Sequence, residues 1–218
     1  MKQNHIMAII QTAALFGIAF ILAGCAPVFS ELQSARTVGK NRLELTPAYS
    51  AAYATVEEMK GEKMQSHIGV RANYGLTSRF DVGLRYERIW LTEEAEADRG
   101  ISIVGVSAKM ALLENRVAVS LPLGRALGED SKDSWQLHPT LLLTLPAVPD
   151  KLDITLAPKY LFTLCEDCED FVAVNLGLAL SSDLNKWAIR PEYGLLYNPG
   201  EKGHFSQFSI GVSMSFGK

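Results

Sequence analysis

The stretch SHIGVRANYGLTSRFDVGLRYER, residues 66–88, decides the fold. Apolar and polar residues alternate through 67–74, a short turn over 76–79 interrupts the pattern, and the alternation returns through 80–87. A period of two separates the two kinds of side chain onto opposite faces of a β-strand, whereas helical spacing would scatter these charges around a cylinder. The stretch therefore predicts a β-hairpin with one apolar face and one polar face.

The same alternation continues from residue 42 to residue 216, in about ten runs of roughly ten residues, which is the length of a tilted strand that crosses a bilayer. Short turns alternate with longer polar loops along the chain. The predicted turns fall near 76–79, 111–116, 146–151 and 181–186, and the predicted loops near 54–65, 91–100, 125–134, 163–170 and 198–204. Bacterial outer-membrane barrels have short periplasmic turns and long extracellular loops. We therefore predict an all-β fold, an up-and-down antiparallel transmembrane β-barrel of about ten strands, with a periplasmic β-sandwich as the alternative.

Aromatic residues and prolines add to this prediction. Aromatic residues fall at both ends of the runs, as in the two aromatic girdles of a membrane barrel. Those at the loop end are Tyr53, Trp90, Trp135, Phe162, Tyr197 and Phe205, and those at the turn end are Tyr74, Phe80, Trp187 and Phe216. Four prolines fall inside predicted strands: Pro47, Pro139, Pro158 and Pro191. Because proline donates no backbone hydrogen bond, each predicts a bulge or a missing bond in the sheet.

The N-terminus has the pattern of an export signal. Lys2 precedes an uncharged, mainly apolar run over 6–23, which then ends at Gly24 and Pro27. Leu22-Ala23-Gly24-Cys25 resembles the lipobox of bacterial lipoproteins, in which the cysteine receives a diacylglyceryl group and the new amino terminus is acylated, for example with palmitate. This resemblance implies a signal peptide over 1–24 and a lipid-anchored linker over 25–40. Residues 41–218 then form the barrel.

The mature chain from about Asn41 to its end resembles small bacterial outer-membrane β-barrels. The resemblance rests on the periodicity and on the last run, FSQFSIGVSMSFGK at 205–218, although Gly217 and Lys218 follow the terminal aromatic Phe216. Ala26 stands where retained lipoproteins carry aspartate, which implies the outer membrane of a two-membrane bacterium. An even strand number returns both termini to the turn side, so the termini are expected in the periplasm. The expected partners are outer-membrane lipid, lipopolysaccharide and other envelope proteins.

The polar face of the runs carries charges of both signs in nearly equal number. They are Arg42, Glu44, Arg71, Asp81, Arg85, Glu87, Lys109, Asp153, Lys159, Arg190 and Glu192. Buried charges have to be paired or hydrated, so these residues predict a salt-bridged lumen that holds a narrow barrel together. The alternative is the lining of a small pore, although a barrel near ten strands is little wider than one filled by its own side chains.

Other candidate sites are few. Cys165 and Cys168 remain as a pair once Cys25 is lipidated, and an oxidising compartment predicts a disulfide between them. His67, His138 and His204 fall near the predicted loop end and could form a general-base or metal site, but no motif supports one. We therefore predict no catalytic residues, no metal and no cofactor apart from the covalent lipid. The formal net charge of −3 argues against a nucleic-acid partner.

The predicted function follows from these features. The chain is expected to be a lipid-anchored outer-membrane barrel without enzymatic activity, with a structural, interaction or transport-accessory role. A narrow, porin-like pore for ions or small solutes is the alternative, and a surface hydrolase that uses the three histidines is a second alternative.

Overall fold

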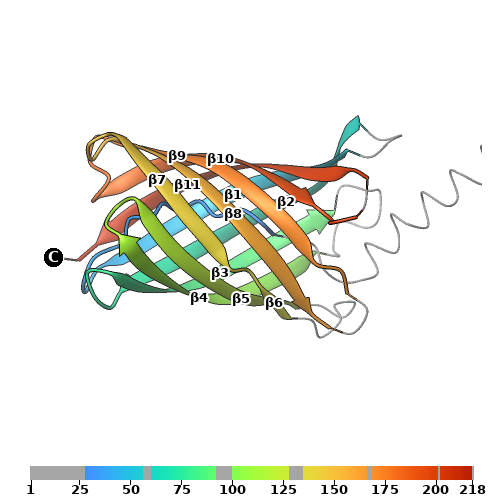
Figure 1. Ribbon diagram of the computed structural model, residues 1–218, viewed down its shortest axis with the longest axis horizontal. Coiled ribbons are helices and arrows are strands. Elements are labelled where there is room, and N and C mark those ends of the chain that lie inside the picture. The colour runs from blue at the N-terminus through green and yellow to red at the C-terminus, as the bar shows by residue number, and fades with distance from the viewer. Residues whose placement is uncertain are drawn as a thin grey trace, which may run out of the picture.

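The computed structural model describes residues 28–55, 60–91, 100–127, 135–165, 168–200 and 202–217. The predicted signal peptide 1–24 and Cys25 lie outside these ranges. Strands account for most of the described chain (Figure 1). They are β1 (Leu43–Thr55), β2 (Lys60–Gly75), β3 (Phe80–Leu91), β4 (Ile101–Leu113), β5 (Val117–Leu127), β6 (Trp135–Leu137), β7 (Thr140–Val148), β8 (Leu152–Leu164), β9 (Phe171–Leu180), β10 (Trp187–Tyr197) and β11 (His204–Phe216). No helix in these ranges is long and apolar enough to cross a membrane.

The strands form a closed antiparallel barrel. Apart from β6 and β7, each strand pairs with the next along the chain, and β1 closes the ring by pairing with β11, from Leu43 opposite Phe216 to Thr55 opposite His204. β6 and β7 both lie between β5 and β8, so they are two parts of one strand interrupted at His138 and Pro139. The barrel therefore has ten strands, as predicted, and not the two sheets of a sandwich.

Short turns and long loops alternate as the sequence predicts. The links 76–79, 114–116, 149–151 and 181–186 lie at one end of the barrel, here called the turn end, where β11 also finishes. Asn115 and Asp150 have φ values of 56° and 55° in two of these turns. Asn and Asp tolerate this left-handed conformation better than other residues with a Cβ, which explains their place there. The other links join the strands at the opposite end, the loop end.

The prolines lie at gaps in strand pairing, as predicted. Pro139 separates β6 from β7. Pro47 pairs with Val70 of β2, but the β1–β11 register passes from Leu45 to Ala48. Pro158 and Pro191 likewise fall in gaps of the β7–β8 and β9–β10 registers while pairing on their other side. Each proline thus leaves unpaired the side of the strand on which it has no N–H to donate.

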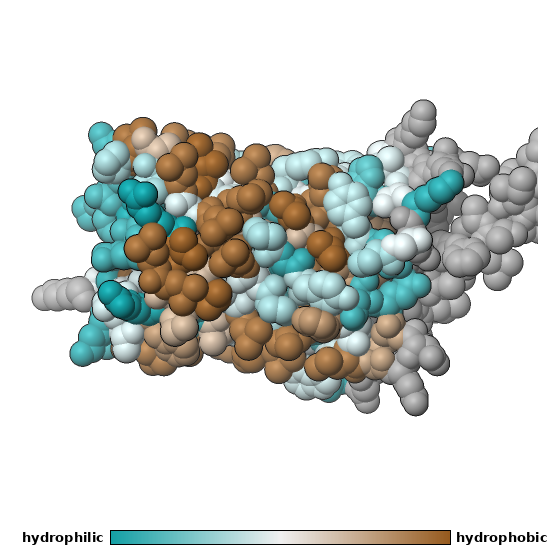
Figure 2. Space-filling view, in the orientation of Figure 1, coloured by the Kyte–Doolittle hydropathy of each residue, from teal (hydrophilic) through white to brown (hydrophobic). Residues whose placement is uncertain are grey.

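The outer face of the barrel is apolar over its middle. Figure 2 shows apolar side chains gathered over the strands, with hydrophilic side chains at the turn end on the left. Leu84, Val106, Leu176 and Tyr193 are each at least half exposed there. Exposed aromatics stand at both ends, with Trp90, Trp135, Phe162 and Tyr197 at the loop end and Tyr74, Trp187 and Phe216 at the turn end. Phe205 differs from the prediction, because it packs against buried residues of the lumen.

Candidate functional site

The lumen is filled by the segment 28–38, here called the plug. Its residues Val28, Phe29, Ser30, Glu31, Leu32, Gln33, Ser34, Ala35 and Val38 are buried, although the segment belongs to no strand. In Figure 1 the first, blue part of the described chain runs inside the barrel before it enters β1. The sequence pattern predicts a linker over 25–40, but in the structure residues 28–38 lie inside the barrel.

The plug runs from the loop end to the turn end. Phe29 packs in a buried cluster with Leu161, Phe171, Ala173 and Leu196, all near the loop end of their strands. At the other end the Thr37 hydroxyl donates to the Ser78 carbonyl in the turn 76–79. The chain then turns at Gly39 and Asn41 and enters β1.

This course corrects the expectation that both termini lie on the turn side. β1 begins and β11 ends at the turn end, as the even strand number requires. The chain before β1, however, passes back through the lumen, so Val28 lies toward the loop end. Strand counting missed this because the plug is extended but does not join the sheet.

Glu31 is the central ion-pairing residue of the plug. Its buried carboxylate pairs with Lys159 of β8 and lies 3.5 Å from Nη1 of Arg71 of β2. Lys159 Nζ also donates to the Phe29 carbonyl at 2.6 Å. Two buried bases on opposite parts of the wall thus share one acid of the plug, and the loss of any partner would leave a buried charge unpaired.

Glu192 of β10 binds the backbone of the plug. Its two carboxylate oxygens accept hydrogen bonds from the N–H groups of Glu31 and Leu32, each at 2.7 Å. Leu32 has a φ of 51°, which is uncommon for a residue other than glycine. Consecutive N–H groups converge on an anion when the backbone changes hand in this way. A lumen carboxylate therefore takes the role that a neighbouring strand has elsewhere in the barrel.

Two further groups hold the loop-end part of the plug. Arg85 of β3 donates to the Ser30 carbonyl at 2.8 Å and to the Ser30 hydroxyl at 2.6 Å, and it also pairs with Glu87. Asn175 of β9 donates to the Phe29 carbonyl at 2.7 Å. The Phe29 and Ser30 carbonyls thus accept hydrogen bonds from side chains of the wall.

At the turn end, Arg36 anchors the plug to β8 and the adjoining turn. Its guanidinium lies 2.6 Å from Asp153, which is fully buried, and 3.0 Å from Asp150, which is exposed. The Val38 N–H donates to both oxygens of Asp81, at 3.2 and 3.1 Å, and Lys109 lies 3.2 Å from Asp81. Lys109 also donates to the Arg36 carbonyl at 2.6 Å.

Two glycines allow the plug to approach the wall closely. A Cβ on Gly194 would lie 2.9 Å from the Phe29 ring, so a larger residue at this position would displace the ring. A Cβ on Gly75 would lie 1.9 Å from the Gly39 carbonyl oxygen, where the chain leaves the lumen. Both ends of the plug therefore depend on a wall position without a side chain.

Of the eleven residues in the predicted charge cluster, ten lie on the inner face of the barrel and one lies at its rim. Ten of its residues have inward-facing side chains that are buried or nearly so: Glu44, Arg71, Asp81, Arg85, Glu87, Lys109, Asp153, Lys159, Arg190 and Glu192. Arg42 instead bonds to the Asn185 carbonyl at the turn-end rim. Glu31 and Arg36 belong to the same network of lumen charges, although the sequence pattern did not predict them. No local pattern pointed to them, because the acids and bases of the wall already nearly balance and the partners of both residues are far away in the sequence.

Little free space remains beside the plug. A cavity of about 50 Å³ lies next to Val28 and is lined by Arg71, Arg85, Gln136 and His138, among others. This volume has room for a few water molecules, since a cavity measured in this way needs about 10–15 Å³ to hold one.

The three histidines belong to different parts of the barrel. His67 is buried on β2, with Nδ1 3.4 Å from a Glu87 oxygen. His138 lies between β6 and β7, 3.3 Å from the Gln136 amide oxygen, and the His204 ring lies 5.7 Å from the Tyr197 ring on the loop side. Across the described ranges, no three His, Cys, Asp or Glu side chains are arranged to hold a metal ion.

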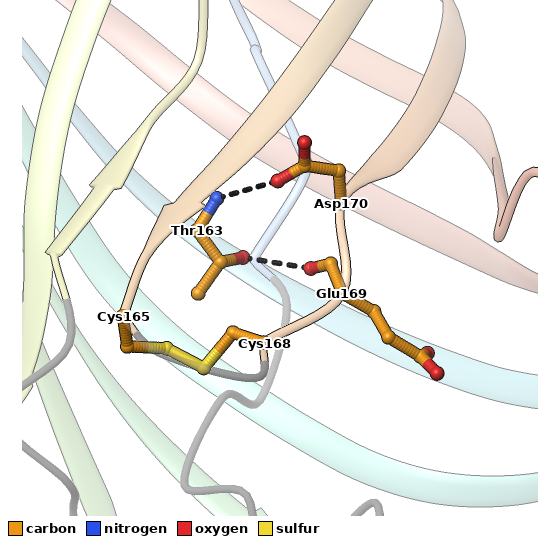
Figure 3. Close-up of a disulfide and its surroundings, with 5 residues drawn as sticks. All are labelled: Thr163, Cys165, Cys168, Glu169 and Asp170. Atoms are coloured by element: carbon orange, nitrogen blue, oxygen red, sulfur yellow. Dashed lines mark hydrogen bonds between the residues drawn. A yellow bond between two sulfur atoms is a disulfide. The ribbon is translucent and has the colours of Figure 1, made fainter.

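A disulfide joins Cys165 and Cys168 in the link between β8 and β9 (Figure 3). Beside it the Thr163 N–H donates to Asp170 and the Thr163 hydroxyl donates to the Glu169 carbonyl, both at 3.0 Å. These hydrogen bonds join the end of β8 to the residues just before β9. The disulfide therefore lies farther out in a loop whose two ends are already held together.

The barrel has counterparts among solved structures. No protein-family description matches the chain, and no curated protein matches it. The translocator domain of the autotransporter NalP from Neisseria meningitidis is 12% identical, with a TM-score of 0.49, over 99% of this chain and 98% of that one. An outer membrane channel from Pseudomonas putida F1 is 8% identical, with a TM-score of 0.48, over 86% and 100%. Neisserial surface protein A is 14% identical, with a TM-score of 0.40, over 81% and 100%.

Proposed function

We propose that the chain is a lipid-anchored outer-membrane β-barrel whose lumen is closed by its own plug and which has a structural or interaction role in the envelope. The observation that carries the proposal is the plug itself, with Glu31, Arg36 and its backbone bound by charged residues of the wall. Because these contacts hold the plug inside the barrel, the lumen is a packed interior and not an open channel.

The outer face supports membrane insertion. Large apolar side chains stand exposed around the middle of the barrel, between two sets of exposed aromatic residues. In water such a surface would be a site of aggregation, whereas a bilayer buries it. By the usual form of outer-membrane barrels the short turns face the periplasm and the longer loops face outward. Acylation of Cys25 would add a second attachment, and the loops would form the surface for partners.

Electrophoresis with and without boiling tests the barrel in solution. A closed barrel stays compact in cold SDS, so the unheated protein is expected to migrate faster than the boiled protein. Equal mobility would contradict the barrel. Labelling with a palmitate analogue, compared with Cys25→Ser, tests the lipid separately.

Recording across a planar bilayer tests the closed lumen. We expect no steady current from the intact protein, because the cavity beside the plug holds only a few waters. A Glu31→Gln/Arg36→Gln variant, which loses ion pairs at both ends of the plug, is expected to show intermittent openings. Steady current from the unaltered protein would overturn the closed-lumen proposal in favour of the narrow pore.

A further inference from the structure

The direction of the plug decides where a lipid on Cys25 can lie. The Phe29 ring contacts Leu161 and Leu196, and the next residues along those strands, Phe162 and Tyr197, face outward at the loop end. The plug therefore begins at the level of the loop-end aromatic residues. It finishes beside Ser78 and Asp81, at the level of the turn end.

The chain before the plug is too short to return to the turn end. Cys25 precedes Val28 by three residues, which reach at most about 11 Å when fully extended. The apolar band of an outer-membrane barrel is roughly 25 Å tall. Cys25 therefore cannot lie at the opposite membrane surface while Val28 occupies its position in the lumen.

Among the residues that the structure describes, the plug itself fills the route through the lumen. Side chains of β2, β3, β8, β9 and β10 contact the plug between Phe29 and Leu32, and the cavity beside Val28 has a volume of about 50 Å³. An acyl chain needs far more space than this. Lipid attached before Val28 has to leave the barrel through the mouth at the loop end.

We propose that the diacylglyceryl and acyl chains of Cys25 insert into the membrane leaflet at the loop end, on the side opposite the C-terminus. The inference rests on the proposed function, namely an outer-membrane barrel acylated at Cys25. With the short turns in the periplasm, this leaflet is the outer one. The barrel then carries its own lipoprotein N-terminus across the membrane, and the plug is the segment that crosses.

Three variants with one epitope tag each test this arrangement. The tag is placed between Pro27 and Val28, between Pro199 and Gly200 in the loop before β11, or between Gly217 and Lys218 after β11. Antibody labelling is measured on intact cells and again after the outer membrane is permeabilised. Heat-dependent mobility and palmitate labelling of each variant establish the barrel and the lipid independently.

We expect the first two tags to be labelled on intact cells, with no gain on permeabilisation, and the tag after Gly217 to rise from background. An N-terminal tag that behaves like the tag after Gly217 would overturn the inference while leaving the outer-membrane barrel intact. If all three tags respond alike, the outer-membrane placement fails, and the inference that rests on it fails too.

A cross-linking pair tests the direction of the plug without a tag. In a Phe29→Cys/Leu196→Cys variant, oxidation is expected to join the two positions, because both side chains lie in one buried cluster at the loop end. The matched control is Phe29→Cys/Ala188→Cys, since Ala188 is buried near the turn end of the same strand. Cross-linking of the control pair in place of the first would show that the plug runs the other way.

Discussion

The plug and the strands around it are both extended, but their backbones are satisfied in different ways. Residues of β1 pair with the backbones of β2 and β11 along nearly their whole length. In the plug, the N–H groups of Glu31, Leu32 and Val38 and the carbonyl of Phe29 are bonded to side chains of the wall. The strands therefore depend on a repeated pattern, whereas the plug depends on a few particular residues, and substitutions should affect the two regions differently.

Removal of Glu31 should have the largest effect. Glu31→Leu leaves Lys159 and Arg71 buried without their acid, and breaking a buried pair in this way costs about 3–5 kcal/mol. The measurement is the midpoint of urea unfolding in detergent or lipid. Glu114→Leu, in an exposed turn, is the control and should change little.

A second substitution checks the cause of that loss. Glu31→Leu/Lys159→Met removes both charges of the closest pair and should recover part of the stability, because a buried pair replaced by apolar residues is often tolerated. If Glu31→Leu were as stable as the unaltered protein, the plug would not occupy the lumen as described.

A charge on the outer face should have the next largest effect. Leu84 is 63% exposed near the middle of β3, and Leu84→Arg should cost about 2–4 kcal/mol in a bilayer, as arginine does near the midplane of barrel proteins. Leu76→Arg, at the turn end, should cost less than about 1 kcal/mol because the guanidinium reaches the interface. Equal stability of the two variants in lipid vesicles would contradict the membrane assignment.

Arg36 tests the turn-end anchor of the plug. Arg36→Ala removes the partner of buried Asp153 and should cost about 1.5–3 kcal/mol, the range for hydrogen bonds to charged groups. Amide hydrogen exchange should accelerate at Val38 more than in β1. Asp150→Asn is the matched variant, because asparagine tolerates the left-handed turn and removes only an exposed charge, so the effect should stay below about 1 kcal/mol. Uniform acceleration across β1 and the plug would show that the two regions open together.

Lys186 should have the smallest effect. Lys186 lies 3.0 Å from Asp183 in the exposed turn 181–186, and its hydrogen bond lowers the pKa of that carboxyl. Lys186→Ala should raise the pKa of Asp183, which NMR titration measures, although the Asn185 N–H still donates to the same carboxylate. The stability that comes from a lowered carboxyl pKa is fully present above the pKa of the unfolded state and is lost as the pH falls through the pKa of the folded state. At neutral pH the contribution is therefore present, but the pair is so exposed that its loss should hardly change the unfolding midpoint. A clear loss would show that the turn supports the barrel.

The difference between the two regions also explains what the sequence could predict. The wall repeats one rule, apolar outside and polar inside, so the ten strands, the alternation of turns and loops, and the inward charges could all be read from residues 42–216. The gaps in strand pairing could also be predicted from the positions of the prolines, since proline lacks the N–H that a sheet needs. These features are local, and each run of residues carries its own signal.

The plug could not be predicted in this way. Its partners are far away in the sequence. The Glu31 N–H donates to Glu192, 161 positions later, and Lys159 donates to the Phe29 carbonyl, 130 positions earlier. A segment with Pro27, Ser30, Ser34 and Gly39 and no period resembles a connecting segment. The charge balance of the wall also hid the need for a partner, because acids and bases there already nearly cancelled.

The same long separations constrain the order in which the molecule can be assembled. The groups that bind the plug are spread over strands from β2 to β10, and Glu192 belongs to β10, the last strand but one. Ordering such distant contacts has to wait until the chain between them is in place, which makes the step slow and late. The N-terminal segment is made first and yet becomes fixed among the last. During assembly this segment has to stay in the space that becomes the lumen. The strands then close into a barrel around it.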